Sequence, residues 1–248
     1  MTEPLLVSEL FYSLQGESTR AGLPCLFIRL AGCNLRCRYC DARYTWEEPS
    51  EPMTPAAILA WVERFPGVMV ELTGGEPLFQ AGALPLLEQL VATDRQVLLE
   101  TNGSLPVDRV PEQVAIIFDV KCPDSGMADH NLPANLDCLL ARRLRGATDE
   151  IKFVLSSEAD FHWARKLVLR HGLERNATVL FSPVRPLLDP ARLAELLLAH
   201  RLNVRLQLQL HTLLWPGCAR GVCPALPARR PPGGDFALKK RKNRLRRD

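Results

Sequence analysis

Three cysteines, Cys33, Cys37 and Cys40, lie within a stretch of eight residues, directly after an apolar run that is typical of a β-strand. Three thiolates at this CxxxCxxC spacing can bind three corners of a cubane iron–sulfur cluster. Because such clusters usually take four cysteine ligands, a compact set of three leaves one iron available to another molecule. The spacing therefore favours an iron–sulfur cluster with one open iron.

Zinc, disulfides and haem fit this spacing less well. Zinc sites need four ligands, typically as two pairs, and no second pair lies close by in the sequence. Disulfides are rare in a chain of this size that lacks a signal peptide, and a c-type haem needs CxxCH, whereas Asp41 follows Cys40. Zinc or unliganded thiols stay open on the spacing alone.

Composition indicates the cellular location of the chain. Its 248 residues are 47% hydrophobic and 24% charged, which suits a single soluble domain with a well-formed core. No apolar stretch approaches the ~20 residues that span a bilayer, and the first residues lack the features of a signal peptide. We therefore expect a cytoplasmic protein with no membrane partner, in which eight reduced cysteines favour metal or cluster chemistry.

Charge divides the chain into two parts. The formal net charge is +3, but residues 224–248 hold nine Lys or Arg against two Asp, so the remainder is mildly acidic. An acidic body is not suited to nucleic acid, and no such partner is expected. We predict one domain over residues 1–222 and a proline-rich, then basic, disordered tail over residues 223–248.

Strand and helix patterns alternate along the domain. Strands are predicted at residues 25–30, 68–72, 97–99, 116–120, 151–155, 178–181 and 204–210, and helices at 55–65, 84–91, 136–144, 158–171 and 190–200. Such alternation indicates an α/β fold with parallel strands and right-handed crossovers. Because these units are too few for a closed eight-fold barrel, we expect an open, partial (βα)6-type TIM-like barrel, with a flat doubly wound sheet as the alternative.

Polar motifs follow two of these strands. Thr73 to Pro77 combines paired glycines, which let a ligand approach the backbone, with a carboxylate that can accept hydrogen bonds from an ammonium group. Glu100 to Gly103 offers an amide and a hydroxyl suited to a sugar or a polar heterocycle. Taken alone, each motif is more typical of a plain turn. Arg29 is a charged residue inside an apolar strand. Its side chain either extends to the end of the strand or binds an anion.

Together, the cysteines, the Gly-Gly-Glu sequence and the expected barrel resemble the radical S-adenosylmethionine superfamily. The resemblance implies a 4Fe-4S cluster on the three cysteines, with S-adenosylmethionine bound to the open iron through its amino and carboxylate groups. The reduced cluster would cleave this cofactor to a 5'-deoxyadenosyl radical, while the protein positions and insulates the reactants. An electron donor such as flavodoxin or ferredoxin is implied as a partner.

A more specific resemblance, to the 7-carboxy-7-deazaguanine synthase family, covers residues 8–222. Its motifs are Phe11 to Glu17, the strand with Arg29, Cys40 with Asp41 and then Tyr44 to Trp46, Thr73 to Pro77, Glu100 to Gly103, Asp119 to Lys121 and Gln209 to His211. The resemblance implies a lyase of queuosine and 7-deazapurine biosynthesis, expected to be a homodimer. It would convert 6-carboxy-5,6,7,8-tetrahydropterin to 7-carboxy-7-deazaguanine by hydrogen-atom abstraction at C6, ring contraction and loss of ammonia.

The same resemblance assigns roles to three sets of residues. The cluster would be held by Cys33, Cys37 and Cys40. The binding site for S-adenosylmethionine would be lined by Tyr39, Asp41, Gly75, Glu76, Asn102, Asp119, Lys121, Ser182 and Val184. Glu76 would hold the amino group of this cofactor. The substrate would contact Leu14, Gln15, Gly16, Glu17, Arg29, Thr73 and His211, with the planar fork of Arg29 on its carboxylate.

One position departs from the family pattern. Where the family usually has a Thr whose hydroxyl ligates magnesium, this chain has Ala42, which supplies no oxygen. We therefore expect weaker magnesium dependence, with Asp41 or water replacing the ligand wherever the ion is used. The other cysteines are expected to be core residues or free thiols, the latter including Cys218 and Cys223.

Two other functions stay open. An activating enzyme for a glycyl-radical partner shares the cysteine spacing and Gly-Gly-Glu, but should lack Arg29 and the loop of Gln15 and Glu17 as a carboxypterin site. A zinc or iron–sulfur binding module without catalysis leaves Gly-Gly-Glu unexplained.

Overall fold

A computed structural model of the chain describes residues 3–218 and 220–221, which form one nine-stranded sheet in the order β3-β1-β2-β4-β5-β6-β7-β8-β9. The strands are β1 (Leu5–Leu14), β2 (Pro24–Leu30), β3 (Glu51–Met53), β4 (Met69–Gly74), β5 (Val97–Thr101), β6 (Val114–Val120), β7 (Glu150–Leu155), β8 (Thr178–Pro183) and β9 (Arg205–Leu206). The α-helices are α1 (Tyr44–Glu47), α2 (Pro55–Val62), α3 (Ala83–Val91), α4 (Pro133–Leu144), α5 (Glu158–Arg170), α6 (Leu173–Asn176), α7 (Pro190–Ala199) and α8 (Leu210–Leu214).

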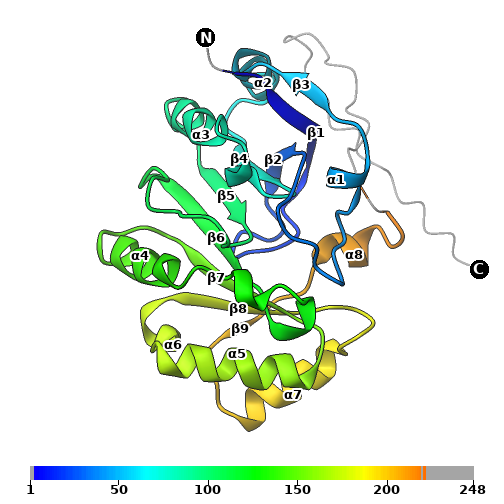
Figure 1. Cartoon of the computed structure of the whole chain (residues 1–248), viewed down its shortest axis with the longest axis vertical. Coiled ribbons are helices and arrows are strands. Elements are labelled where there is room, and N and C mark those ends of the chain that lie inside the picture. The colour runs from blue at the N-terminus through cyan, green and yellow to red at the C-terminus, as the bar shows by residue number, and fades with distance from the viewer. Residues whose placement is uncertain (1–2, 219, 222–248) are drawn as a thin grey trace, which may run out of the picture.

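The sheet is parallel from β2 through β9, and β1 and β3 add an antiparallel edge. Because β3 and β9 are the two ends of the strand order, the sheet curves without closing. Helices α3, α4 and α5 cover its outer face, whereas α1 and α8 lie on the opposite side (Figure 1). The expected open, partial barrel is therefore confirmed.

Local sequence signals start the outer helices. Proline occupies the first turn of α2 and α7, where no backbone N–H is needed. The side chains of Thr54, Ser157 and Asp189 each accept a hydrogen bond from a backbone N–H of the first turn of α2, α5 and α7, respectively. These caps satisfy donors that the helix itself leaves free.

Two apolar clusters fill the two faces of the sheet. The larger one packs the outward-facing strand residues against the helices. The smaller one lies on the inner face and comprises Phe11, Cys25, Phe27, Met69, Leu98, Ala115 and Ile117. Its members on the parallel strands occupy the first four positions of those strands, so side chains fill the amino-terminal end of the barrel. Space for a ligand is thereby left at the carboxyl ends.

The end of the sheet differs from the prediction. A strand over residues 204–210 was expected, but β9 contains only Arg205–Leu206 and α8 begins at Leu210. The backbone N–H of Leu210 donates to the carbonyl oxygen of Gly16 at 3.0 Å, which draws the chain from the sheet edge toward the loop after β1. The predicted tail, residues 223–248, lies outside the described residues.

Helices long and apolar enough to cross a membrane do not occur among the residues that the structure describes.

Candidate active site

A cavity of about 650 Å³ opens at the carboxyl ends of the parallel strands, a volume suited to a small-molecule site. Most residues assigned from the sequence line it together. They are Leu14, Gln15, Gly16, Glu17, Arg29, Cys33, Cys37, Tyr39, Cys40, Asp41, Thr73, Gly75, Asn102, Asp119, Lys121, Val184 and His211. Glu76 and Ser182 are the two assigned side chains that do not line it.

The cysteine loop follows β2 and is held by its neighbours. The Cys33 sulfur accepts hydrogen bonds from the backbone N–H of Leu35 at 3.4 Å and from the Asn102 amide at 3.7 Å. Burial raises the pKa of Cys37, and burial likewise raises the pKa of Cys40 to about 11. All three thiols are free of disulfides. Donors aimed at a thiolate sulfur are typical of iron–sulfur sites, so these residues fit a cluster.

The three sulfurs do not converge on a single metal ion. Among the described residues, no group of three or more His, Cys, Asp or Glu side chains is arranged to hold one ion. This arrangement agrees with a cubane cluster, in which each cysteine ligates a different iron.

The glycine pair after β4 packs directly against the cysteine loop. A Cβ on Gly75 would lie 2.0 Å from the carbonyl oxygen of Gly32 and 2.8 Å from the Cβ of Cys33. Backbone hydrogen bonds run from Gly75 N to Leu30 O and from Glu76 N to Gly32 O. Only glycine fits at position 75, and its backbone forms part of the cavity wall beside the cysteines.

Glu76 joins two loops and does not face the cavity. Its side chain is fully buried, and its oxygens accept hydrogen bonds from the Thr101 hydroxyl and from the backbone N–H groups of Leu78 and Asn102 at 2.7 to 2.9 Å. Three protein donors thus hold this carboxylate between the two loops, and Glu76 positions Gly75 and Asn102. Its expected contact with the cofactor's amino group stays a prediction.

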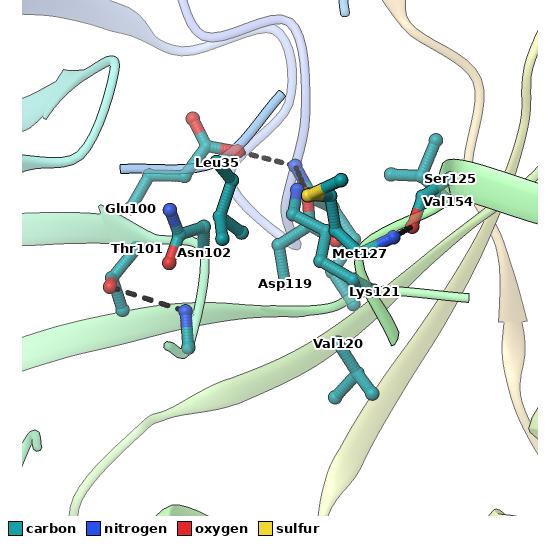
Figure 2. A network of polar contacts seen from close by, with 12 residues as sticks. Leu35, Glu100, Thr101, Asn102, Asp119, Val120, Lys121, Ser125, Met127 and Val154 are labelled. Atoms are coloured by element: carbon teal, nitrogen blue, oxygen red, sulfur yellow. Dashed lines mark hydrogen bonds and ion pairs between the residues drawn. The ribbon is translucent and has the colours of Figure 1, made fainter. Parts of the chain in front are cut away.

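The side of the cavity next to the cysteines carries the other residues assigned to the cofactor. The Tyr39 hydroxyl donates to the Val154 carbonyl at 3.0 Å, and Lys121 pairs with Asp119 at 2.8 Å. Asp119 and Lys121 lie between Asn102 and Val154 in Figure 2. The second Asp119 oxygen and the Ser182 hydroxyl are buried and lack a hydrogen-bond partner among the described residues. The Asp119 oxygen lies on a residue that lines the cavity, so this unpaired acceptor suits a polar ligand such as S-adenosylmethionine, whereas Ser182 lies behind the cavity wall.

The loop after β1 forms the opposite side. Gln209 donates its amide to Glu17 at 2.9 Å, which ties the loop to the start of α8. Gly16 lies under His211, since a Cβ at this position would approach the His211 Nδ1 to 2.7 Å. The structure thus brings together two segments that are nearly two hundred residues apart, as the sequence assignments of Glu17 and His211 require.

Arg29 lies at the end of β2 with its fork partly free. Its Nε donates to Glu9 at 2.8 Å, and the Tyr44 hydroxyl donates to the same Glu9 oxygen at 2.7 Å. The two terminal nitrogens of Arg29 have no hydrogen-bond partner among the described residues. The side chain lines the cavity, so these two donors are available to an anionic ligand.

A buried ammonium group connects the carboxylates of the cavity. Lys152 Nζ contacts Glu100, lies 2.8 Å from Glu17 and lies 3.9 Å from Asp119. Burial opposes ionisation of Lys152, but these carboxylates outweigh it and raise the pKa of Lys152 well above its ordinary value. Burial likewise opposes ionisation of Glu100, yet Lys152 lowers the pKa of Glu100 to about 2. Glu100 also accepts a hydrogen bond from Thr73 at 3.0 Å.

Position 42 supplies no oxygen ligand for magnesium. Ala42 has no side-chain oxygen, and its carbonyl oxygen already accepts hydrogen bonds from the backbone N–H of Thr45 at 3.0 Å and from the Thr45 hydroxyl at 2.8 Å. Both lone pairs of that oxygen are therefore in use. Ala42 therefore offers no free oxygen to a magnesium ion, and replacement of this ligand by Asp41 or water stays a prediction.

Sequence reasoning missed Glu71 and Lys152, and it assigned Glu100 no role. Each of these side chains lines the cavity. The signal that singled out Arg29, a charge inside an apolar strand, is also present at Glu71 in β4 and at Lys152 in β7.

Known proteins are similar to this chain in sequence and in fold. Residues 27–125 match the Radical SAM superfamily. The chain is 49% identical over 219 residues to the 7-carboxy-7-deazaguanine synthase of Chlorobaculum tepidum, with 88% of this chain and 98% of the relative covered. It is 43% identical to the 7-carboxy-7-deazaguanine synthase of Koribacter versatilis, with 87% and 99% covered.

The chain belongs to the 7-carboxy-7-deazaguanine synthase family. Solved structures agree at the level of the fold. QueE from Escherichia coli superposes with a TM-score of 0.65 at 23% identity, covering 82% of this chain and 94% of that one. Streptococcus suis SuiB, bound to S-adenosylmethionine, gives a TM-score of 0.54 at 16% identity, covering 74% and 50%. As a member of the 7-carboxy-7-deazaguanine synthase family, the chain is a radical S-adenosylmethionine enzyme with a 4Fe-4S cluster.

Proposed function

We propose that the chain converts 6-carboxy-5,6,7,8-tetrahydropterin to 7-carboxy-7-deazaguanine with loss of ammonia. The observation that carries the proposal is one cavity that joins the three cysteines to the free fork of Arg29. When bound, the cluster and S-adenosylmethionine supply a carbon radical that abstracts a hydrogen atom. The protein's own residues bind and orient the substrate.

Arg29 binds the substrate carboxylate through its two terminal nitrogens. Glu9 holds its Nε, and Tyr44 holds Glu9, so the guanidinium plane is fixed before the substrate arrives. A fixed fork loses little entropy on binding and recognises a planar carboxylate with two parallel hydrogen bonds. Arg29 thereby sets the position of C6, the carbon that carries the carboxylate.

Glu17, Thr73 and His211 surround the ring system. Lys152 donates to one oxygen of Glu17 at 2.8 Å and Gln209 donates to the other at 2.9 Å, so the carboxylate is held in position to accept a ring N–H. The loop with Leu14, Gln15 and Gly16 closes this side of the cavity.

The cofactor residues form the cysteine side of the cavity. Cys33, Cys37 and Cys40 would hold the cluster, and Tyr39, Asp41, Asn102, Asp119, Lys121 and Val184 would line S-adenosylmethionine. Gly75 contributes its backbone, which Glu76 positions. Ser182 contributes the buried hydroxyl that lacks a protein partner among the described residues.

Magnesium is dispensable or weakly bound in this proposal, because Ala42 offers no free oxygen. An acidic electron carrier such as flavodoxin or ferredoxin is the proposed reductant, which is supported by exposed Arg36, Arg38 and Arg43 in and beside the cysteine loop. The expected homodimer and cytoplasmic location stay predictions.

Anaerobic reconstitution with iron and sulfide tests the function. We expect a 4Fe-4S absorption band and, with dithionite, S-adenosylmethionine and carboxytetrahydropterin, formation of 7-carboxy-7-deazaguanine detected by mass spectrometry. A protein that binds no cluster contradicts the radical reaction. A protein that cleaves S-adenosylmethionine but never consumes carboxytetrahydropterin contradicts the substrate alone and favours the glycyl-radical activating alternative.

A further inference from the structure

The floor of the cavity contains a carboxylate, Glu71, that the proposed reaction leaves without a role. Glu71 is an inner-face residue of β4, paired in register with Phe27 of β2 and Leu98 of β5. Its neighbours on the floor are therefore members of the inner apolar cluster. Glu71 is only 2% exposed, yet it lines the cavity.

Glu71 differs from three neighbouring carboxylates of the cavity in having no cation. Glu17, Glu100 and Asp119 share Lys152, whereas none of the ion pairs among the described residues includes Glu71. Burial, together with Glu100 and Glu17, raises the pKa of Glu71 well above its ordinary value. Ionisation of this group is therefore costly in the empty cavity, and a ligand whose N–H groups hydrogen-bond to its oxygens stabilises the ionised carboxylate.

One amide prepares Glu71 for such a ligand. The Gln15 amide nitrogen donates to Glu71 Oε2, and the Gln15 amide oxygen accepts from the backbone N–H of Glu17 at 3.0 Å. The second bond fixes which end of the amide faces Glu71. Gln15 therefore supplies one donor and leaves the rest of the carboxylate's acceptor capacity to the cavity.

The depth of Glu71 relative to Arg29 suits a flat two-ring ligand. Arg29 is in register with Thr73, and Glu71 lies two residues earlier on the same strand. At 3.3 Å per residue, the two layers are about 7 Å apart along the strands. A pteridine with a carboxylate on one ring and an amino group at the far end of the other spans a distance of this order.

We propose that Glu71 is the specificity-determining residue for the amino-pyrimidinone edge of the substrate, accepting hydrogen bonds from the ring N3–H and the exocyclic 2-amino group. This inference rests on the proposed function. Adjacent N–H donors match the two oxygens of one carboxylate, as in bidentate pairing with arginine. A heterocycle with an oxygen at C2 presents a lone pair where the amino group was, and Glu71 rejects it.

Binding of two stable analogues tests the assignment in the reconstituted protein. Pterin-6-carboxylate and lumazine-6-carboxylate carry the same carboxylate and differ in having an amino or an oxo group at C2. The wild-type protein is expected to bind the pterin roughly 10- to 100-fold more tightly, which is the range of one hydrogen bond to a charged group. Isothermal titration under anaerobic conditions measures both affinities.

Glu71→Gln is the decisive variant, because its amide oxygen can still accept from Gln15 while its amide NH2 can donate to a 2-oxo group. The preference for pterin should fall at least tenfold or reverse. Glu112→Gln, the same change at an exposed ion pair with Arg145, should keep the wild-type preference. Thermal unfolding and the cluster absorption band check that each variant is folded. If Glu71→Gln does not fold, Glu71→Asp replaces it and should weaken pterin binding but keep the sign of the preference.

Equal wild-type affinities for the two analogues, or an unchanged preference in Glu71→Gln, overturn the role of Glu71. Turnover of carboxytetrahydropterin by the wild-type enzyme in the same preparation still supports the proposed function, so failure of the inference and failure of the function are distinguished.

Discussion

The Nζ atom of Lys152 lies 2.8 Å from Oε2 of Glu17, although 135 positions separate the two residues in the chain. The same ammonium contacts Glu100 on β5. Through this one group, the loop after β1 and two parallel strands present their charges to the cavity in a fixed arrangement.

Replacement of Lys152 by Met should destabilise the fold strongly. Removal of the cation leaves Glu17 and Glu100 without their partner in a buried site, which costs about 3 to 5 kcal/mol for a broken buried pair. Urea denaturation of the apoprotein measures the loss. Arg192→Met is the matched control, because Arg192 also pairs with two carboxylates but on the surface, and it should change stability little. Equal losses in the two variants would show that the buried network is not needed for the fold.

Arg29→Ala should weaken substrate binding without affecting the cluster. Loss of the two free guanidinium nitrogens should raise KM for carboxytetrahydropterin roughly 10- to 100-fold, the range expected for hydrogen bonds to a charged group. Steady-state kinetics measure KM, and the absorption spectrum of the reconstituted cluster serves as the control. Loss of the cluster in this variant would show that Arg29 supports the cluster and would contradict its assignment to the substrate.

Chelation should leave the wild-type enzyme active. Because Ala42 supplies no magnesium ligand, treatment with EDTA is expected to reduce turnover only slightly. Ala42→Thr introduces a hydroxyl and should make turnover more dependent on added magnesium. Strict dependence of wild-type turnover on tightly bound magnesium would contradict this prediction.

Acid should act on stability through Glu100. The pKa of Glu100 in the folded protein is lowered from 4.5 to about 2, because Lys152 outweighs the opposing effect of burial. A pKa that is lower in the folded than in the unfolded state stabilises the fold at pH values above the unfolded-state pKa. This contribution is lost as the pH falls from about 4.5 toward 2. Glu100→Gln should therefore lose less stability than the wild type between pH 5 and pH 3 in urea denaturation. Glu47→Gln, at an exposed residue of α1 with no ion pair among the described residues, should follow the wild-type curve.

Gly75→Ala should prevent cluster assembly. Its methyl group would meet the carbonyl oxygen of Gly32 at 2.0 Å, so the cysteine loop must move away. Iron content and the cluster absorption band after reconstitution measure the effect. Gly146→Ala is the control, since its Cβ meets no atom within 4 Å although its φ of +96° is unfavourable for alanine. Normal iron loading in Gly75→Ala would mean that the two loops can separate without loss of the site.

Much of the fold was predictable because its signals are local. Apolar runs and proline caps gave the strands and outer helices to within a few residues, and the cysteine spacing indicated the cluster. The short β9 was not predictable, since the backbone hydrogen bond from Leu210 to Gly16 joins the chain after β9 to the distant loop after β1.

The candidate site was predictable in part for a related reason. Motifs within one segment were found, such as the cysteine loop and the glycine pair. Glu71 and Lys152 were not found, because a charge in a strand gains meaning only when its neighbours across the barrel are known. The buried carboxylate of Glu76 shows a second limit, because its hydrogen bonds to Thr101 and Asn102 join two loops that are not adjacent in the sequence.

The hydrogen bonds that join the loop after β1 to the start of α8 bear on how the protein is made. A ribosome releases the three cysteines early, whereas Gln209 and His211 emerge near the end of the described chain. A nascent chain that has not yet reached them carries every cluster ligand but lacks one wall of the substrate cavity. The set of cluster ligands and the wall of the substrate cavity are thus completed at different points of synthesis.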